Sequence, residues 1–141
     1  MIILDTNVVS EPLKQEPVRT VLEWLDAQAP ETLFLTSITL AELYAGIESM
    51  PTGRRKTELS LALLDRVVPL FEGRILVFDS KAAQAFARVN AKAQSAGNPI
   101  GFADGAIAAI AAANSFCVAT RNVKDFKGTG VEIINPWDGK S

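Results

Sequence analysis

The chain has 141 residues, of which 48% are hydrophobic and 21% charged, and its formal net charge is −2. This composition predicts one folded domain over residues 1–141 and excludes an intrinsically disordered chain. Histidine is absent, which excludes Ser-His-Asp and Cys-His catalysis and most zinc sites. The one cysteine leaves no disulfide framework, which favours a reducing compartment such as the cytoplasm.

The first half of the chain predicts two buried strands separated by helices. Residues 1–4 are an apolar run without alternation, typical of a strand buried on both faces, and the run is too short for a signal peptide. A helical turn limited by Pro12 follows, and a helix is expected from Pro17, at a favourable first position, to about residue 28. The remaining expected elements are a strand at 32–36 and helices at 37–48 and 54–70.

The second half continues the alternation of strands and helices. We expect a strand at 75–78, helices at 80–94 and 102–113, a strand at 116–120, a helical turn at 122–126 and a strand at 131–134. The uncharged stretch 105–120 is shorter than the roughly 20 residues of a membrane span, so it is interpreted as buried core. The order predicts an α/β fold, a three-layer α/β/α domain around a mostly parallel sheet of about five strands.

Four acidic residues fall where strands end or helices begin. Asp5 ends the first strand, Glu42 lies early in the helix after the second strand, and Asp104 lies in the first turn of the apolar helix. Asp125 lies in the helical turn after the fourth strand, three residues after Asn122. The carboxyl ends of parallel strands meet at one edge of a sheet, so these side chains are expected near one another.

Each of these residues also has a purely structural interpretation. Asp5 and Asn122 suit helix N-caps, and Asp104 suits the dipole of a first helical turn. Thr39 and Glu42 have the spacing of a capping box. Asp104, however, heads a helix that is apolar all round, so a carboxylate there needs a partner.

Taken together, the acids suggest a metal site. Three or four carboxylates at one edge would repel one another and would need a cation. Oxygen ligands without histidine or thiolate select a hard ion, Mg²⁺ or Mn²⁺. Such a site suits hydrolysis of phosphodiester bonds.

Four motifs in order resemble PIN-domain ribonucleases, and more narrowly VapC-type toxins of type II (VapBC) toxin–antitoxin modules in the FitB-like branch. The resemblance runs from Met1 to Trp137. The motifs are Ile-Leu-Asp-Thr-Asn at 3–7, Ser-Ile-Thr-Leu-Ala-Glu-Leu-Tyr-Ala-Gly at 37–46, Phe-Ala-Asp-Gly-Ala-Ile-Ala-Ala at 102–109 and Thr-Arg-Asn-Val-Lys-Asp-Phe at 120–126, with a closing Asn-Pro-Trp at 135–137.

The resemblance implies an endoribonuclease that uses Mg²⁺, with Mn²⁺ able to substitute, and that cuts tRNA or rRNA. It also implies neutralisation by a cognate antitoxin, a homodimer and a toxin–antitoxin hetero-oligomer. No membrane partner is expected, because the uncharged stretch 105–120 is too short to span a membrane.

The resemblance also assigns roles to particular residues. Asp5, Glu42 and Asp104 correspond to the main acids and metal ligands. The family's fourth acid often falls where this chain has Asn122, so either Asn122 or the catalytic candidate Asp125 is expected to complete the site. Thr6 and Thr120 correspond to residues that orient carboxylates or the scissile phosphate.

Because the net charge is only −2, an RNA-binding surface must be a local patch. Arg54 and Arg55 form a basic cluster at a helix start, which is equally well interpreted as a solvated loop. Arg88 shares a helix face with other cations, and Arg121 lies next to the acids in sequence. These four arginines are the predicted RNA-binding residues, expected to hold RNA phosphates on either side of the metal.

Three alternatives remain open at this stage. A PIN-like fold without activity would be a scaffold or interaction subunit, against which the set Asp5, Glu42 and Asp104 argues. An aspartyl-phosphate phosphatase usually needs a second acid two residues after the first, where this chain has Asn7. A phosphoacceptor receiver domain would use Asp79, but it lacks the acid pair expected after the first strand.

Overall fold

The computed structural model describes residues 1–138, so residues 139–141 of the predicted domain lie outside the described part. Its five strands form one sheet in the order β3-β2-β1-β4-β5, and every recorded strand pair is parallel. The strands are β1 (Ile2–Leu4), β2 (Leu33–Thr36), β3 (Ile75–Leu76), β4 (Cys117–Ala119) and β5 (Ile133–Ile134). The predicted parallel α/β architecture is confirmed, with β1 at the centre of the sheet.

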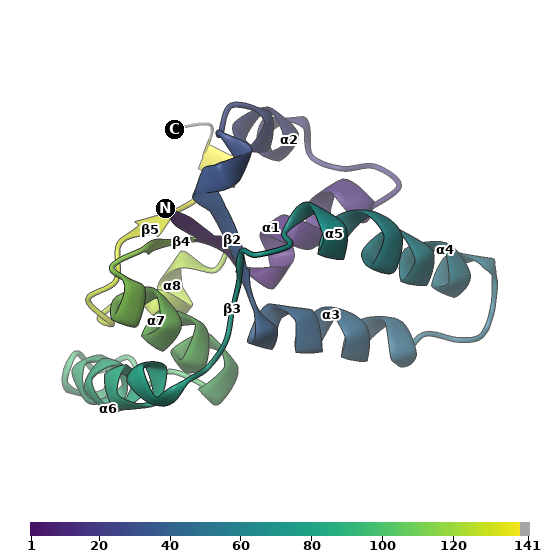
Figure 1. Ribbon diagram of the computed structural model, residues 1–141. Coiled ribbons are helices and arrows are strands. Elements are labelled where there is room, and N and C mark those ends of the chain that lie inside the picture. Colours follow the sequence, from purple (N-terminus) through teal and green to yellow (C-terminus); the bar gives the residue numbers. More distant parts are fainter. Residues whose placement is uncertain (139–141) are drawn as a thin grey trace.

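Helices connect all the strands (Figure 1). The α-helices are α1 (Thr6–Ser10), α2 (Arg19–Asp26), α3 (Ser37–Glu48), α4 (Arg54–Ala62), α5 (Val68–Leu70), α6 (Ser80–Ser95), α7 (Phe102–Asn114) and α8 (Val123–Phe126). Short 3₁₀ turns lie at Glu11–Leu13, Pro30–Thr32 and Pro136–Asp138, and a π-helical segment lies at Leu63–Val67. Among residues 1–138, none of these helices combines the length and apolarity needed to cross a membrane.

The sheet separates two hydrophobic cores, which gives the three layers. Neighbouring residues of one strand contribute to opposite cores, because side chains alternate across a sheet. Leu4 and Ala119 pack with residues of α1, α2, α3 and the π segment, whereas Ile3 and Val118 pack with residues of α6, α7 and α8. Figure 1 accordingly shows α6 and α7 on one side of the strands and α1 and α2 on the other.

Helix α7 is the most buried helix of the fold. Every residue from 105 to 111 is buried, as its apolar composition predicts. Since α7 packs between the sheet and α6, its first turn is carried to the carboxyl edge of the sheet. The position of Asp104 is therefore set by the packing of the whole helix.

Two predicted helices differ in detail from the structure. The helix expected from Pro17 begins at Arg19, because Val18 is extended and its N–H donates to the Glu11 carboxylate. The helix expected over 54–70 contains the π-helical segment 63–67 before α5. Pro69 cannot donate a backbone hydrogen bond and crowds the carbonyl four residues earlier, which the wider π turn accommodates.

Candidate active site

Asp5 lies at the carboxyl end of β1 and its carboxylate is almost fully enclosed. The residue as a whole is only 3% exposed to solvent. Oδ1 accepts a hydrogen bond from the backbone N–H of Thr6 (2.8 Å), which makes Asp5 the N-cap of α1. Oδ2 accepts the hydroxyl hydrogen of Thr120 (2.7 Å), which follows the neighbouring strand β4. Asp5 can therefore cap a helix and also belong to the predicted site. Its Oδ1 caps α1, while its Oδ2 connects the end of β1 to the residue after β4.

Asn7 is a residue of this network that the sequence interpretation left out of the predicted site. Its amide nitrogen lies 3.3 Å from Asp5 Oδ2 and 3.4 Å from Thr120 Oγ1. Its amide oxygen accepts the backbone N–H of Arg121 (3.1 Å). Asn7 thereby connects the start of α1 to the segment after β4. The signal in the sequence is a second polar side chain in the same short turn as Asp5.

Glu42 reaches the same region from α3. The hydroxyl of Thr6 donates to Glu42 Oε1 at 2.6 Å, so Thr6 contacts Asp5 through its backbone and Glu42 through its side chain. The capping-box interpretation of Glu42 is wrong. The N-cap of α3 is Thr36, whose hydroxyl accepts the N–H of Thr39, because β2 runs directly into the helix without a loop.

The pKa of Asp104 depends on the three other acids of the predicted site. Its pKa is raised from 3.8 to about 6, first by burial and then by the negative charges of Asp5, Asp125 and Glu42. Each neighbouring carboxylate disfavours a further negative charge. The four predicted acids therefore share one electrostatic environment at the carboxyl edge of the sheet.

The segment after β4 contributes Asn122 and Asp125. Asn122 occupies the N-cap position of α8, but no side-chain cap hydrogen bond forms there. Its backbone N–H instead donates to Thr120 Oγ1 (3.0 Å). Asp125 lies in the first turn of α8, is exposed, and raises the pKa of Asp104 through its charge.

The donor set is suited in chemistry to a hard divalent cation. The acidic side chains offer oxygen atoms only, and their mutual repulsion at Asp104 is the kind of excess charge that a cation relieves. Within residues 1–138, however, no three acidic or cysteine side chains are grouped closely enough to hold a metal ion. The carboxylates lie within electrostatic range of Asp104 without converging on one point.

The predicted RNA-binding arginines lie in different parts of the structure. Arg121 follows Thr120, whose hydroxyl donates to Asp5, and the Arg121 guanidinium lies over the Trp137 ring (5.3 Å). Arg54 pairs with Glu58 on the surface of α4, and Arg55 donates to the carbonyl oxygen of Leu13 (2.6 Å). The hydrogen bond of Arg55 ties α4 to the 3₁₀ turn after α1.

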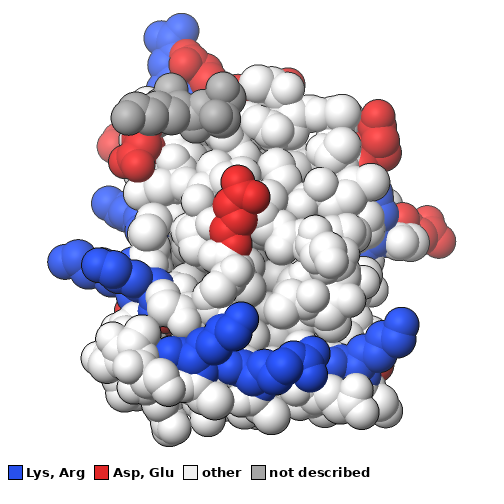
Figure 2. All heavy atoms as spheres, turned by 90° about the vertical axis from the view of Figure 1, so that its left-hand side faces the viewer, with Lys and Arg blue, Asp and Glu red and all other residues white. Residues whose placement is uncertain are grey.

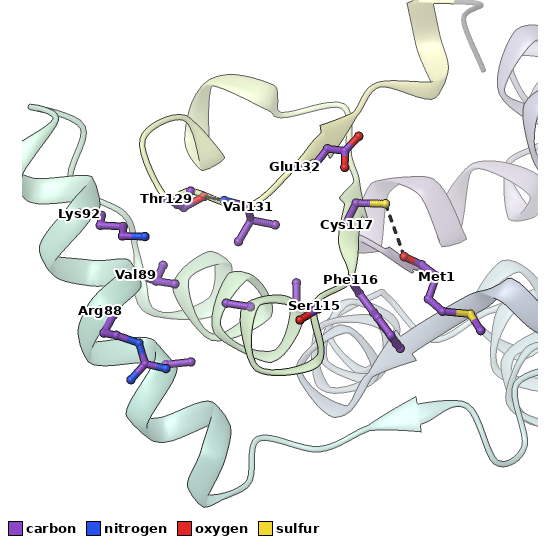
Figure 3. Close-up of a pocket in the computed structure, with 14 residues that line it drawn as sticks. Met1, Arg88, Val89, Lys92, Ser115, Phe116, Cys117, Thr129, Val131 and Glu132 are labelled. Atoms are coloured by element: carbon purple, nitrogen blue, oxygen red, sulfur yellow. Dashed lines mark hydrogen bonds between the residues drawn. The ribbon is translucent and has the colours of Figure 1, made fainter.

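Arg88 lies towards the other edge of the sheet. It lines a pocket with Met1 and Cys117, at the amino ends of β1 and β4 (Figure 3). The acids, in contrast, follow the carboxyl ends of these strands. Arg88 therefore does not border the acidic cluster, contrary to the expectation that it flanks the metal.

Glu11 is a second residue that the sequence interpretation did not identify. It is only 1% exposed, and Lys14 Nζ lies 2.9 Å from its Oε1. Burial raises its pKa, but hydrogen bonds from Lys14 and the Val18 N–H and the charge of Arg121 outweigh burial and leave the pKa lowered. Glu11 thus stays ionised and fixes the turn between α1 and α2.

Residues 2–131 match the model of the PIN domain. The chain belongs to the PIN domain family. This PIN domain is 50% identical over 138 residues to plasmid stability protein StbB of Pseudomonas syringae pv. tomato, which covers 98% of this chain and 99% of that protein. Its identity to VapC ribonuclease Y4jK of Sinorhizobium fredii is also 50%, with the same coverage.

A solved structure has the same fold. The crystal structure of FitAcB from Neisseria gonorrhoeae aligns with this PIN domain with a TM-score of 0.92 and 43% identity, over 97% of this chain and 99% of that one. A structure of FitAB bound to a DNA fragment aligns with a TM-score of 0.93 and 42% identity, over 97% and 96% of the two chains. The predicted resemblance to VapC-type and FitB-like PIN proteins is confirmed.

Proposed function

We propose that this PIN domain is an endoribonuclease toxin that hydrolyses phosphodiester bonds of RNA. The observation that carries the proposal is the shared environment of Asp5, Glu42, Asp104 and Asp125, in which burial and then the charges of the three other carboxylates raise the pKa of Asp104 to about 6. A carboxyl group with a raised pKa, placed near other acids at the carboxyl edge of a parallel sheet, is typical of a catalytic centre. The relatives named as VapC ribonuclease and FitB toxin support the same activity.

In this proposal Asp5, Glu42 and Asp104 would hold Mg²⁺, and Mn²⁺ could replace it, which requires the three carboxylates to come closer together than they lie in this structure. When bound, such an ion lowers the pKa of a coordinated water and stabilises the departing oxygen of a phosphodiester. Asp125 completes the acidic set, and the exposed amide of Asn122 is the alternative oxygen donor beside it.

The polar residues around the acids have positioning roles. Thr120 and Asn7 orient the Asp5 carboxylate, and Thr6 orients Glu42. Such hydrogen bonds restrict the rotation of a ligand and present its free oxygen atoms in a fixed direction. In this proposal Arg121, which follows Thr120 in the chain and whose guanidinium lies over Trp137, contacts an RNA phosphate.

The proposed partners are a cognate antitoxin and an RNA substrate in the cytoplasm, tRNA or rRNA being the expected class. The relatives FitB and VapC occur in solved complexes described as FitAB and VapBC, which supports a toxin–antitoxin assembly for this chain. A homodimer within that assembly is part of the proposal.

The proposal is tested by comparing the wild type with Asp5→Asn. We expect the wild type to cleave single-stranded RNA in the presence of Mn²⁺ and the variant to lose at least 100-fold in rate, on the order of the loss when an essential metal-site contact is removed. Asp26→Asn, which removes an exposed carboxylate at the end of α2, is the matched control and should cleave like the wild type. Equal cleavage by wild type and Asp5→Asn, or none by either, would favour the scaffold alternative.

A further inference from the structure

Positive charge is concentrated on α6. This helix carries Lys81, Arg88 and Lys92 and no acidic residue, although the whole chain has a net charge of −2. Residues seven and four positions apart lie on one side of a helix, and all three side chains are exposed. Figure 2 shows the resulting row of Lys and Arg side chains along the lower part of this face, where α6 lies.

These cations are not neutralised within the described chain. Over residues 1–138 the ion pairs are those of Lys14, Arg19 and Arg54. Glu132 lines the same pocket as Arg88 but forms no ion pair in this part of the chain. The positive charge of α6 is therefore available to an external anion.

Arg88 and Lys92 face a hollow between α6 and the loop before β5. The cavity has a volume of about 440 Å³, and Figure 3 shows both side chains directed towards it from α6. Gly130 forms part of the opposite wall with φ of +85°, and a Cβ there would lie 3.2 Å from Lys92 Nζ. The absence of a side chain at Gly130 thus leaves space around the Lys92 amine.

Two further exposed cations lie next to Asp125 in the chain. Lys124 and Lys127 flank Asp125 on α8 and its C-cap, and both are exposed. The side-chain amide of Asn98 donates to the carbonyl oxygens of Lys124 (2.8 Å) and Lys127 (2.7 Å), which holds α8 against the segment that follows α6. A Cβ at Gly128 would lie 2.8 Å from the Cβ of Ala96, so the two segments are in close contact.

We infer that Arg88, Lys92, Lys124 and Lys127, here called the basic track, bind the phosphates of RNA on one side of the cleavage site. The inference rests on the proposed ribonuclease function and extends it to the course of the substrate. The track starts at Asp125 in the acidic cluster and ends in the cavity of Arg88. Contacts to phosphates supply affinity and orientation without selecting a base sequence.

The test compares two double variants that remove the same charge. Arg88→Gln/Lys92→Gln removes the distal half of the track, and Arg19→Gln/Arg66→Gln removes two exposed cations on α2 and the π segment as control. Each phosphate contact to a single strand contributes about 5-fold in affinity at roughly 0.1 M salt, so two contacts contribute about 25-fold.

We therefore expect the track variant to raise KM for a single-stranded RNA of about 20 nucleotides by about 25-fold, with kcat unchanged. The track variant and the wild type should cleave a substrate of roughly five nucleotides equally well, because an RNA near the lower limit of single-strand binding sites does not reach the cavity. The slope of log(kcat/KM) against log(salt concentration) should become less steep by about 1.4, because two phosphate contacts are lost. The control variant should match the wild type in all three measurements.

Binding of the same long RNA, followed by fluorescence anisotropy, separates this inference from the proposed function. If the wild type binds RNA and Arg88→Gln/Lys92→Gln weakens this binding, but the wild type cleaves nothing, the proposed nuclease activity is wrong and the basic track remains only as an RNA-binding surface. If the wild type cleaves RNA but both double variants have its KM and Kd, the track is wrong and the nuclease stands. Weakened binding of duplex DNA alone, with RNA binding unchanged, would also overturn the assignment.

Discussion

The raised pKa of Asp104 reflects, first, the burial of its carboxyl group and, second, the negative charges of three acids at the same edge of the sheet. Its pKa of about 6 in the folded chain exceeds its ordinary value of 3.8, so the folded state holds this proton more tightly than the unfolded state does. Stability therefore falls as pH rises from about 3.8 to about 6, and the full penalty applies above that range. Because the carboxyl is partly open to solvent, the penalty is about 1–2 kcal/mol.

Asp104→Asn removes this penalty, because an amide does not ionise. Without divalent metal, we expect the variant to be about 1–2 kcal/mol more stable than the wild type at pH 7.5, and equally stable at pH 3.5. Urea unfolding at the two pH values measures the difference. Asp26→Asn should leave stability nearly unchanged at both. A stabilisation of Asp104→Asn that does not depend on pH would show that packing, rather than charge, limits this position.

At the scale of elements, the close approach of α7 to α6 fixes where Asp104 lies. A Cβ on Gly105 would be 2.9 Å from Cε2 of Phe86 on α6, closer than carbon atoms pack. Gly105→Ala should therefore destabilise the protein by about 1–3 kcal/mol, as overpacking does, even though alanine favours a helix. Gly46→Ala on α3, where nothing lies within 4 Å of the new Cβ, should instead stabilise by about 0.5–1 kcal/mol.

Thermal unfolding of both variants, together with Gly105→Ala/Phe86→Leu, measures these effects. The smaller Leu side chain should restore part of the stability lost in Gly105→Ala. If Gly105→Ala is as stable as the wild type, then Phe86 moves freely and α7 is not held by this contact.

The same elements show what could be predicted from sequence. Strand and helix order followed from apolar runs and breakers, so β1, α6 and α7 were predicted almost to the residue. The π segment was missed because it depends on how Pro69 is accommodated inside a continuous helix. The start of α2 was misplaced because Glu11, seven residues before Val18, captures its N–H.

The acidic site could be predicted as a location but not as a network. Parallel strands carry Asp5 and Thr120 to one edge, and this follows from topology. Asn7 forms hydrogen bonds with Thr120 and Arg121, which follow it by 113 and 114 positions in the chain. No local sequence pattern predicts contacts over such a separation. The prediction placed Arg88 too near the acids. Helical spacing shows which face of the helix carries Arg88, but it does not show whether that residue lies near the amino or the carboxyl edge of the sheet.

At the scale of the whole molecule, charge is segregated. The acids lie at the carboxyl edge of the sheet, while Arg88 and Lys92 of α6 line a cavity near its amino edge. A nearly neutral chain with a net charge of −2 thus carries two regions of opposite sign. A polyanion approaching the acidic edge is repelled unless a cation lies there, so metal binding and RNA binding are expected to be coupled.

Metal binding should also be coupled to pH, because a proton on Asp104 competes with the ion. At pH 8, Mn²⁺ or Mg²⁺ at 100 times its Kd should stabilise the wild type by about 2.7 kcal/mol. At pH 5, below the Asp104 pKa of about 6, the same concentration should stabilise it much less. Differential scanning fluorimetry at matched ionic strength measures both shifts. Asp104→Asn should show a reduced shift at pH 8, whereas Asp26→Asn should respond like the wild type. Equal metal-induced shifts at the two pH values would mean that the ion binds without Asp104, and that the proposed ligand set is incorrect.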